Sequence, residues 1–120
     1  MATEQWQHIG SEETLKTKPC NRLHAEDDKR YDLVLVYVRG QFYAMEAWCS
    51  HAGGPLFKGD IEDFNGRPHI QCPWHGYLFD AETGKNQLGI KQEMFPTKVE
   101  NGQVYVQYRC ALCTSPFPKS

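Results

Sequence analysis

Residues 49–85, CSHAGGPLFKGDIEDFNGRPHIQCPWHGYLFDAETGK, decide how this chain folds. They contain two short groups, Cys49 with His51 and Cys72 with His75, each set among glycine and proline. Glycine and proline at this density mark loops, so each group is expected in a loop. Thiolate and imidazole together suit zinc, iron and iron–sulfur centres, whereas calcium and magnesium take oxygen ligands. The sequence therefore predicts that the two loops hold a metal centre.

Strand-like runs surround both loops. β-Branched, aromatic and apolar residues at 31–38 and 41–47 flank Arg39-Gly40 and predict a hairpin. Asn65-Gly66 predicts a tight turn between two further strands. The remaining expected elements are a short strand at 77–80, a last hairpin at 95–108 around Asn101-Gly102, and one short helix at 11–16 with Ser11 as its N-cap. The expected fold class is all-β, a small antiparallel sandwich or barrel of short strands.

Length and composition narrow the class of protein further. A chain of 120 residues predicts a single domain, residues 1–120. A formal net charge of −2 gives no basic surface for nucleic acid. No apolar run is long enough to span a bilayer, and the first residues lack the apolar core of a signal peptide. Five cysteines, an odd number, argue against a disulfide framework, so we expect a cytoplasmic protein.

Two kinds of centre fit the four residues. One is a tetrahedral Cys₂His₂ zinc site, and the other is a [2Fe–2S] cluster in which two histidines replace two cysteines on one iron. Common zinc fingers pair cysteine with cysteine and histidine with histidine. Here each loop carries one of each, C-x-H in the first and C-x-x-H in the second. This mixed spacing favours a cluster gripped between two loops, each giving its cysteine to one iron and its histidine to the other.

The same segment resembles a Rieske iron–sulfur domain in its C-x-H…C-P-x-H-G form, with HAGGPL and FDAETG flanking the ligand pattern. From about residue 6 to residue 108 the chain is similar to soluble Rieske-type ferredoxins. The resemblance implies one [2Fe–2S] cluster, with Cys49 and Cys72 on one iron and His51 and His75 on the other. It also implies a Rieske-type fold with a cluster-binding part at about 48–80, followed by a loose tail at 109–120.

By this resemblance the protein is an electron carrier and not an enzyme. It is expected to be a monomer that passes one electron at a time from a flavoprotein reductase to an oxygenase or another acceptor. At this length there is no room for the catalytic iron domain of a Rieske oxygenase. Three alternatives stay open: a small electron-feeding subunit of the nitrite reductase type, a cluster-based redox sensor, and a zinc-stabilised interaction module.

The sequence departs from respiratory Rieske proteins at two pairs of positions. Their disulfide-forming cysteines match Gly54 and Trp74 here, so no disulfide can join the loops. Their potential-raising serine and tyrosine match Tyr77 and Phe79. Without those hydroxyl donors to sulfur we predict a reduction potential at the low end of the Rieske range, about −150 mV.

Several other residues receive simpler expectations. Pro96 resembles the proline of a third loop that covers the cluster. The C-x-x-C pair Cys110 and Cys113 is expected to be incidental. The histidines outside the pattern are expected to be structural: His8, His24 and His69.

Overall fold

The computed structural model describes residues 5–118. Its elements follow one another as β1 (Gln5–Ser11), α1 (Glu12–Leu15), β2 (Cys20–Ala25), η1 (Lys29–Tyr31), β3 (Leu33–Val38), β4 (Gln41–Glu46), η2 (Leu56–Lys58), β5 (Asp60–Phe64), β6 (Arg67–Gln71), β7 (Leu78–Asp80), β8 (Met94–Phe95), β9 (Thr97–Glu100), β10 (Gln103–Tyr108) and β11 (Leu112–Cys113). The predicted all-β antiparallel class is confirmed.

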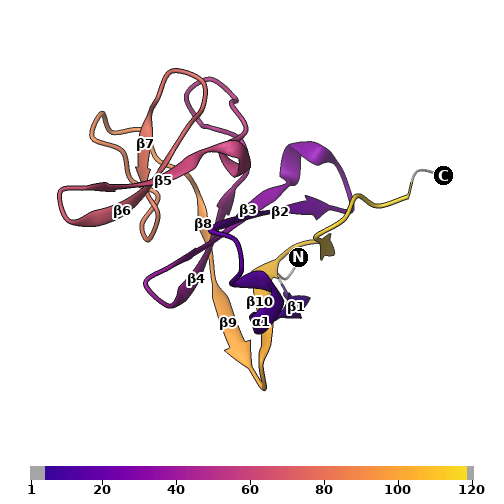
Figure 1. Cartoon of the computed structure of the whole chain (residues 1–120). Helices are drawn as coiled ribbons and strands as arrows, with labels where there is room; N and C mark the ends of the chain where they lie inside the picture. The colour runs from indigo at the N-terminus through magenta and orange to yellow at the C-terminus, as the bar shows by residue number, and fades with distance from the viewer. Residues whose placement is uncertain (1–4, 119–120) are drawn as a thin grey trace.

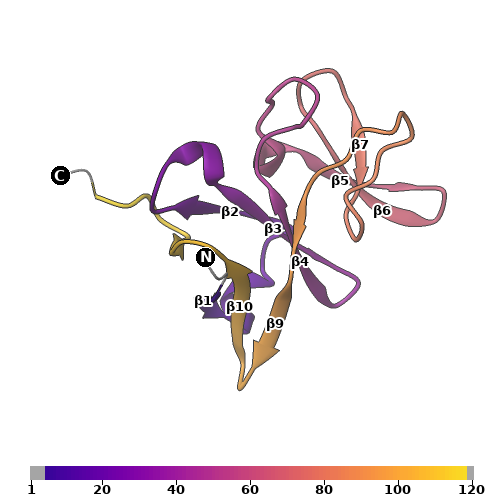
Figure 2. The ribbon, with the colours of Figure 1, turned by 180° about the vertical axis from the view of Figure 1, so that it is seen from behind.

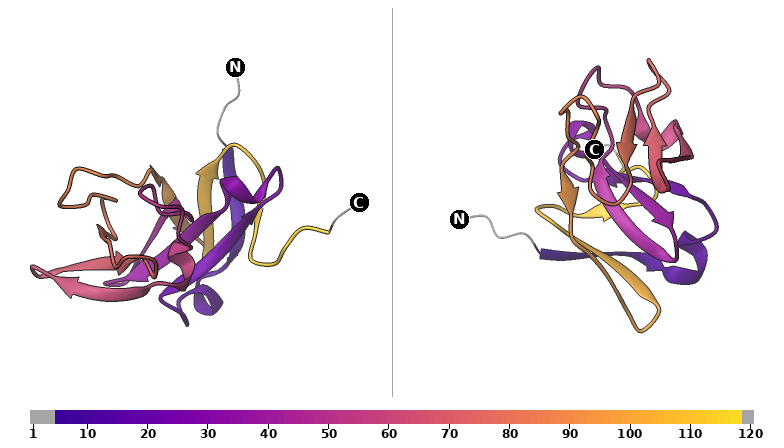
Figure 3. Two further views of the ribbon diagram at one scale, coloured as in Figure 1. Left: turned by 90° about the horizontal axis from the view of Figure 1, so that it is seen from above. Right: turned by 90° about the vertical axis from the view of Figure 1, so that its left-hand side faces the viewer.

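The strands form three antiparallel sheets. Their orders are β1-β10-β9, β11-β2-β3-β4-β8 and β5-β6-β7. The sheet of β5, β6 and β7 lies at one end of the molecule, and the sheet of β1, β10 and β9 lies at the other, with β3 and β4 between them (Figures 1 and 2). Seen from above in Figure 3, the same three parts follow one another across the molecule.

Strand β3 separates two hydrophobic cores. Leu33 and Leu35 point into the core shared with β1 and β10, whereas Val34 and Val36 point into the core shared with the β5-β6-β7 sheet. All four side chains are buried. Successive side chains of a strand point to opposite faces, so a strand buried on both faces reads as an unbroken apolar run. This explains the sequence DLVLVYV, and it places the second core directly beneath the ligand loops.

The predicted hairpins and the predicted helix are present. Arg39-Gly40, Asn65-Gly66 and Asn101-Gly102 each have positive φ at both residues, as tight two-residue hairpin turns require. Helix α1 begins after Ser11, whose hydroxyl accepts a hydrogen bond from the Thr14 amide at 3.2 Å. The turn and periodicity signals in the sequence predict no strand at β1, β2 or β11.

The predicted loose tail is wrong for residues 110–113. Strand β11 pairs with β2, with Leu112 opposite Ala25 and Cys113 opposite His24. Cys110 and Leu112 are buried in the core that contains β10. Their apolar side chains complete that core, which is why the chain continues past β10. The ends of the predicted domain, residues 1–4 and 119–120, lie outside the described residues.

Across residues 5–118, no helix has the length and apolar character needed to cross a membrane.

Candidate metal centre

The two cysteine–histidine groups lie in two loops with the same backbone hydrogen-bond frame. In the first loop, the Cys49 amide donates to Gly54 O at 2.7 Å, and the Gly53 amide donates to Cys49 O at 2.7 Å. In the second, the Cys72 amide donates to Tyr77 O at 2.8 Å, and the Gly76 amide donates to Cys72 O at 3.1 Å. Each cysteine therefore opens a closed turn of the same size.

Left-handed backbone closes both turns. Gly53 has φ 76° and Gly76 has φ 71°, conformations that residues with a side chain rarely adopt. His75, just before Gly76, also has positive φ, at 82°. A histidine held in this region costs energy and occurs mainly where the surrounding structure requires it. The second loop therefore fixes the direction of His75 through its backbone.

The cysteines are buried and the histidines are exposed. Cys49 is 3% and Cys72 is 1% exposed, and both belong to the core beneath the loops. His51 and His75 lie at the surface, with ring centroids 5.8 Å apart and ring planes at 88°. The structure thus brings one histidine of each loop to the other, as the predicted shared centre requires.

The buried Cys72 thiol lies in an environment that disfavours its ionised form. Burial raises the pKa of Cys72, the Trp74 amide partly opposes this rise, and the neighbouring Cys49 raises the pKa further. Two adjacent thiolates repel each other and are poorly solvated, unless a cation lies between them. Metal binding removes these protons and couples the affinity of the site to pH.

Gly54 and Trp74, the two positions at which the resemblance predicts no disulfide, face each other across the two loops. A Cβ atom on Gly54 would lie 2.6 Å from Cys72 Sγ and 3.0 Å from Trp74 Cγ. The absence of a side chain at Gly54 therefore allows the loops to approach. Trp74 keeps half its surface exposed, at 50%.

Tyr77 and Phe79 take different positions beside the ligands. The Tyr77 ring lies against the His51 ring in a tilted arrangement, with centroids 4.1 Å apart and planes at 39°. Phe79 is fully buried in the core with Cys49 and Cys72. Tyr77 thus links the second loop to the histidine of the first.

A third loop, residues 81–93, contributes a residue that sequence reasoning missed. Gln92 is fully buried, and its side chain makes hydrogen bonds to the backbone of the first ligand loop. An isolated glutamine carries no motif, so only the fold reveals it. Pro96, predicted to lie in a loop over the cluster, lies instead between β8 and β9, where its carbonyl accepts from the Gln107 amide at 2.9 Å. That prediction is wrong.

The other histidines have structural contacts away from the ligand loops. His8 Nε2 lies 2.7 Å from Gln103 Oε1, and His69 Nδ1 lies 2.9 Å from Arg67 O. His24 Nδ1 lies 3.8 Å from Asp32 Oδ2. Burial lowers the pKa of His24, Arg22 lowers it further, and Asp32 opposes these two effects.

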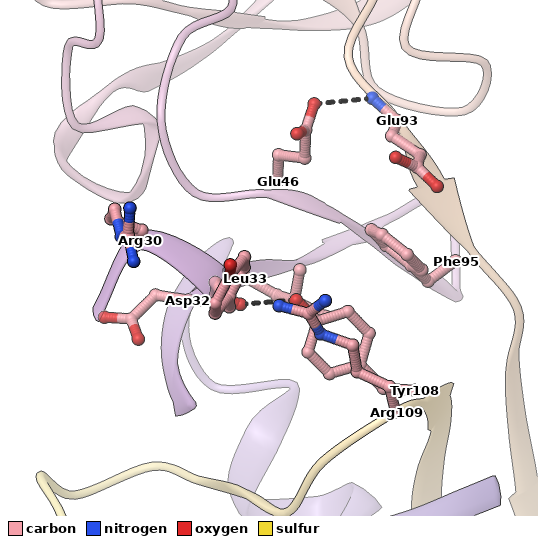
Figure 4. A pocket seen from close by; sticks show the side chains of 9 residues that line it. Arg30, Asp32, Leu33, Glu46, Glu93, Phe95, Tyr108 and Arg109 are labelled. Carbon is pink, nitrogen blue, oxygen red and sulfur yellow. Dashed lines mark hydrogen bonds between the residues drawn. The ribbon is translucent and has the colours of Figure 1, made fainter. Parts of the chain in front are cut away.

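A separate pocket of about 230 Å³ contains none of the four candidate ligands (Figure 4). It lies between η1, the end of β4 and the end of β10, and Arg30, Glu46, Glu93 and Arg109 line it. The Tyr108 hydroxyl donates to Tyr31 O at 2.7 Å at its edge. This pocket is therefore distinct from the candidate centre.

The donor set fits a cluster with one buried and one exposed iron. Two thiols lie in the core, two imidazoles lie above them at the surface, and matched loops supply one of each. Thiolate and imidazole are the ligands of histidine-ligated [2Fe–2S] centres. In the part of the chain that the structure describes, no three Cys, His, Asp or Glu side chains surround a point as the ligands of one ion would.

Comparisons with known proteins agree on one family. The protein-family model for soluble Rieske-type ferredoxins matches residues 7–88 of this chain. The human Rieske domain-containing protein is 36% identical over 126 residues, covering 91% of this chain and 76% of that protein.

Two solved structures share the fold. One chain of a complex of reduced oxygenase and oxidized ferredoxin in carbazole 1,9a-dioxygenase aligns with a TM-score of 0.73 and 26% identity, covering 88% of this chain and 94% of that one. An NADH-dependent nitrite reductase small subunit from Mycobacterium tuberculosis aligns with a TM-score of 0.75 and 18% identity, covering 86% and 94%. The second likeness carries the fold alone.

Proposed function

The chain belongs to the family of soluble Rieske-type ferredoxins, and from this premise we propose which residues hold its cluster and which proteins exchange electrons with it. The protein binds a [2Fe–2S] cluster and is an electron carrier. When bound, a cluster of this type takes up and gives back one electron at a time.

The proposed ligands are Cys49 and Cys72 for the buried iron and His51 and His75 for the exposed iron. The observation that carries this assignment is the burial of both cysteines at equivalent points of two matched loops, each of which also presents an exposed histidine. The cysteine end excludes water, and the core around it supplies a medium of low polarity. The histidine end meets the solvent, so a partner protein can approach the imidazole rings directly.

The histidine rings are the proposed route for the electron. His51 and His75 are the exposed members of the proposed ligand set, and the Tyr77 ring lies against that of His51. The chain therefore needs no substrate pocket of its own, and we assign it the role of a carrier without catalytic activity. We further propose that residues 1–120 form one domain that acts as a cytoplasmic monomer.

The proposed donor is a flavoprotein reductase, and the proposed acceptor is an oxygenase or another redox protein. Support comes from the structural relative solved as a complex of oxygenase and ferredoxin, which the chain matches over most of both lengths. A low reduction potential would suit this position between a nicotinamide-fed flavoprotein and an oxygenase.

The ligand proposal is tested by single substitutions. Each of four variants should lose most of the iron and the visible absorption of the cluster, because each removes one of the four bonds between the protein and iron. The variants are Cys49→Ser, Cys72→Ser, His51→Ala and His75→Ala. Cys113→Ser and His8→Ala, which change a cysteine and a histidine outside the loops, should keep both. A variant such as His75→Ala with normal iron content and spectrum would refute the assignment.

The partner proposal is tested separately with the cluster-loaded wild-type protein. Mixed with NAD(P)H and a ferredoxin reductase containing flavin, the protein should be reduced within the time of the reductase's turnover, and the reduced form should be reoxidised by an oxygenase component. Reduction by dithionite but by no flavoprotein would exclude the proposed donor class while leaving the ligand set intact.

A further inference from the structure

Gln92 is a fully buried polar side chain at the end of the third loop. Its backbone amide donates to Gly84 O at 2.8 Å, so its position is set by the turn at 80–84. A Cβ atom on Gly84 would lie 2.4 Å from Gln92 O, and Gly84 has φ 78°. Only glycine permits this close backbone approach. This turn begins at the end of β7, and β7 is the strand that follows the second ligand loop.

The Gln92 side chain spans from this turn to the first ligand loop. Its Nε2 donates to Glu46 O at 3.2 Å and to Trp48 O at 2.9 Å, and its Oε1 accepts from the Ser50 amide at 2.6 Å. Two donors and one acceptor match three partners, so only one orientation of the side-chain amide satisfies them all.

The neighbouring residue reinforces the link. The Glu93 amide donates to Glu46 Oε1 at 3.0 Å, a contact drawn in Figure 4, and the Glu46 amide donates to Glu93 O at 3.2 Å. The end of the third loop is therefore joined to the end of β4 immediately before the first ligand loop begins.

The Ser50 amide lies between two proposed ligands, Cys49 and His51. The residue that follows the ligand cysteine in the second loop is Pro73, which has no N–H. In neither loop is the backbone N–H after the ligand cysteine free to donate elsewhere. Pro73 has no N–H, and the Ser50 N–H already donates to Gln92. An N–H that donates to cluster sulfur would stabilise the electron-rich reduced state.

We propose that Gln92 is a positioning residue for the iron–sulfur cluster. It holds the peptide between Cys49 and His51 in one orientation, and it ties the first ligand loop to the turn that follows the second. It thereby supplies the link between loops that Gly54 and Trp74, having no thiols, do not form. This inference rests on the proposed assignment of Cys49 and His51 as ligands.

The test uses Gln92→Leu in the cluster-loaded full chain. Because the Ser50 amide and two carbonyls lose their partner in the buried Gln92 side chain, the cluster should be released roughly fivefold faster or more under a chelator, the equivalent of about 1 kcal/mol. The reduced EPR spectrum should shift its g values, and the midpoint potential should rise because the Ser50 amide is free to donate to sulfur.

Val104→Ala is the matched control, since Val104 is fully buried in the other core. It should lower the unfolding temperature and leave the g values and midpoint potential unchanged. Gln92→Glu is the second variant, because it keeps an oxygen for the Ser50 amide and loses the two donated bonds. It should release the cluster faster than the wild type, because a carboxylate oxygen would then face the Glu46 and Trp48 carbonyls.

Wild-type release rates and g values in Gln92→Leu would overturn the inference, as would equally fast release from a Val104→Ala protein of matched stability. If Gln92→Leu does not fold, the same measurement on Gln92→Glu tests the inference. Cluster release from Gln92→Glu at the wild-type rate would overturn it. Failure here is distinct from failure of the ligand proposal. A cluster that survives Cys49→Ser refutes the ligands, whereas a cluster lost in Cys49→Ser but unaffected in Gln92→Leu refutes only the role of Gln92.

Discussion

At the scale of single residues, the side chains at 77 and 79 bear on the reduction potential of the cluster. The Tyr77 ring lies tilted against His51, and Phe79 is buried with the proposed cysteine ligands but has no hydroxyl to donate to sulfur. Fewer donors to sulfur destabilise the reduced state relative to the oxidised state.

We predict a midpoint potential near the low end of the Rieske range, about −150 mV. Phe79→Tyr should raise it by about 40 mV, the equivalent of one hydrogen bond worth about 1 kcal/mol more to the reduced state. Direct electrochemistry of both proteins measures these values. A wild-type potential well above zero would contradict the prediction.

Gly54 is the residue on which the approach of the two ligand loops depends. Gly54→Ala places a Cβ atom against Cys72 Sγ and Trp74, so we expect a loss of about 1–3 kcal/mol in stability together with reduced cluster content. Iron analysis and urea unfolding measure both. Gly10→Ala is the control, because a Cβ atom there meets only Leu15, with Cδ1 at 3.6 Å and Cγ at 3.9 Å, which are ordinary contacts. Full cluster occupancy in Gly54→Ala would show that the loops tolerate wider separation.

At the scale of elements, the turn at 80–84 connects the second ligand loop to Gln92, and Asp80 organises it. Arg67 Nε donates to Asp80 Oδ2 at 2.5 Å, and the amides of Glu82 and Thr83 donate to Oδ1 at 2.8 and 3.1 Å. Burial would raise the pKa of Asp80, but these donors and the Arg67 charge outweigh it, so the pKa lies below its ordinary value of 3.8.

A carboxylate with a lowered folded-state pKa stabilises the fold above its unfolded-state pKa and loses that contribution as pH falls through the folded-state value. Asp80→Asn should therefore cost about 1–2 kcal/mol at neutral pH and lose less additional stability than the wild type below pH 3.8. Urea unfolding as a function of pH measures this, with the exposed Asp63→Asn as control. Parallel pH curves for wild type and Asp80→Asn would contradict it.

Elements with local signals could be predicted from the sequence, and elements formed by distant pairing could not. Turn residues in the sequence predict the three hairpins, at Arg39-Gly40, Asn65-Gly66 and Asn101-Gly102. Strand β1 pairs with β10 about a hundred residues away, with a register shift between His8 and Gly10, so its own sequence gives little indication. Strand β11 is two residues long and depends on β2 for its pairing.

At the scale of the whole molecule, the central ribbon of β3 and β4 separates a supporting core from a core that carries the ligand loops. The supporting core lies against β1 and β10 and fixes the ribbon. The ribbon then holds the two loops at one end of the molecule (Figure 1). There the cysteines lie within the second core and the histidines face solvent. This division buries the two proposed cysteine ligands and exposes the two proposed histidine ligands.

The four candidate ligands were predictable because cysteine and histidine at these spacings are chemically distinctive. Gln92 was not, because its role arises from hydrogen bonds between residues more than forty positions apart. Residue types with distinctive chemistry can be recognised in the sequence. Hydrogen bonds between distant residues, such as those of Gln92, can be recognised only in the folded structure.

The central claim is that two cysteines on one iron and two histidines on the other hold a [2Fe–2S] cluster in this chain. The most direct measurement is pulsed EPR of the dithionite-reduced protein with ¹⁵N-labelled histidine. The account predicts two strongly coupled histidine nitrogens in the wild type, and the loss of the cluster signal or of one coupling when His51 or His75 is replaced. A reduced cluster without histidine nitrogen coupling, or a colourless protein that holds one zinc per chain after anaerobic cluster reconstitution, would contradict it.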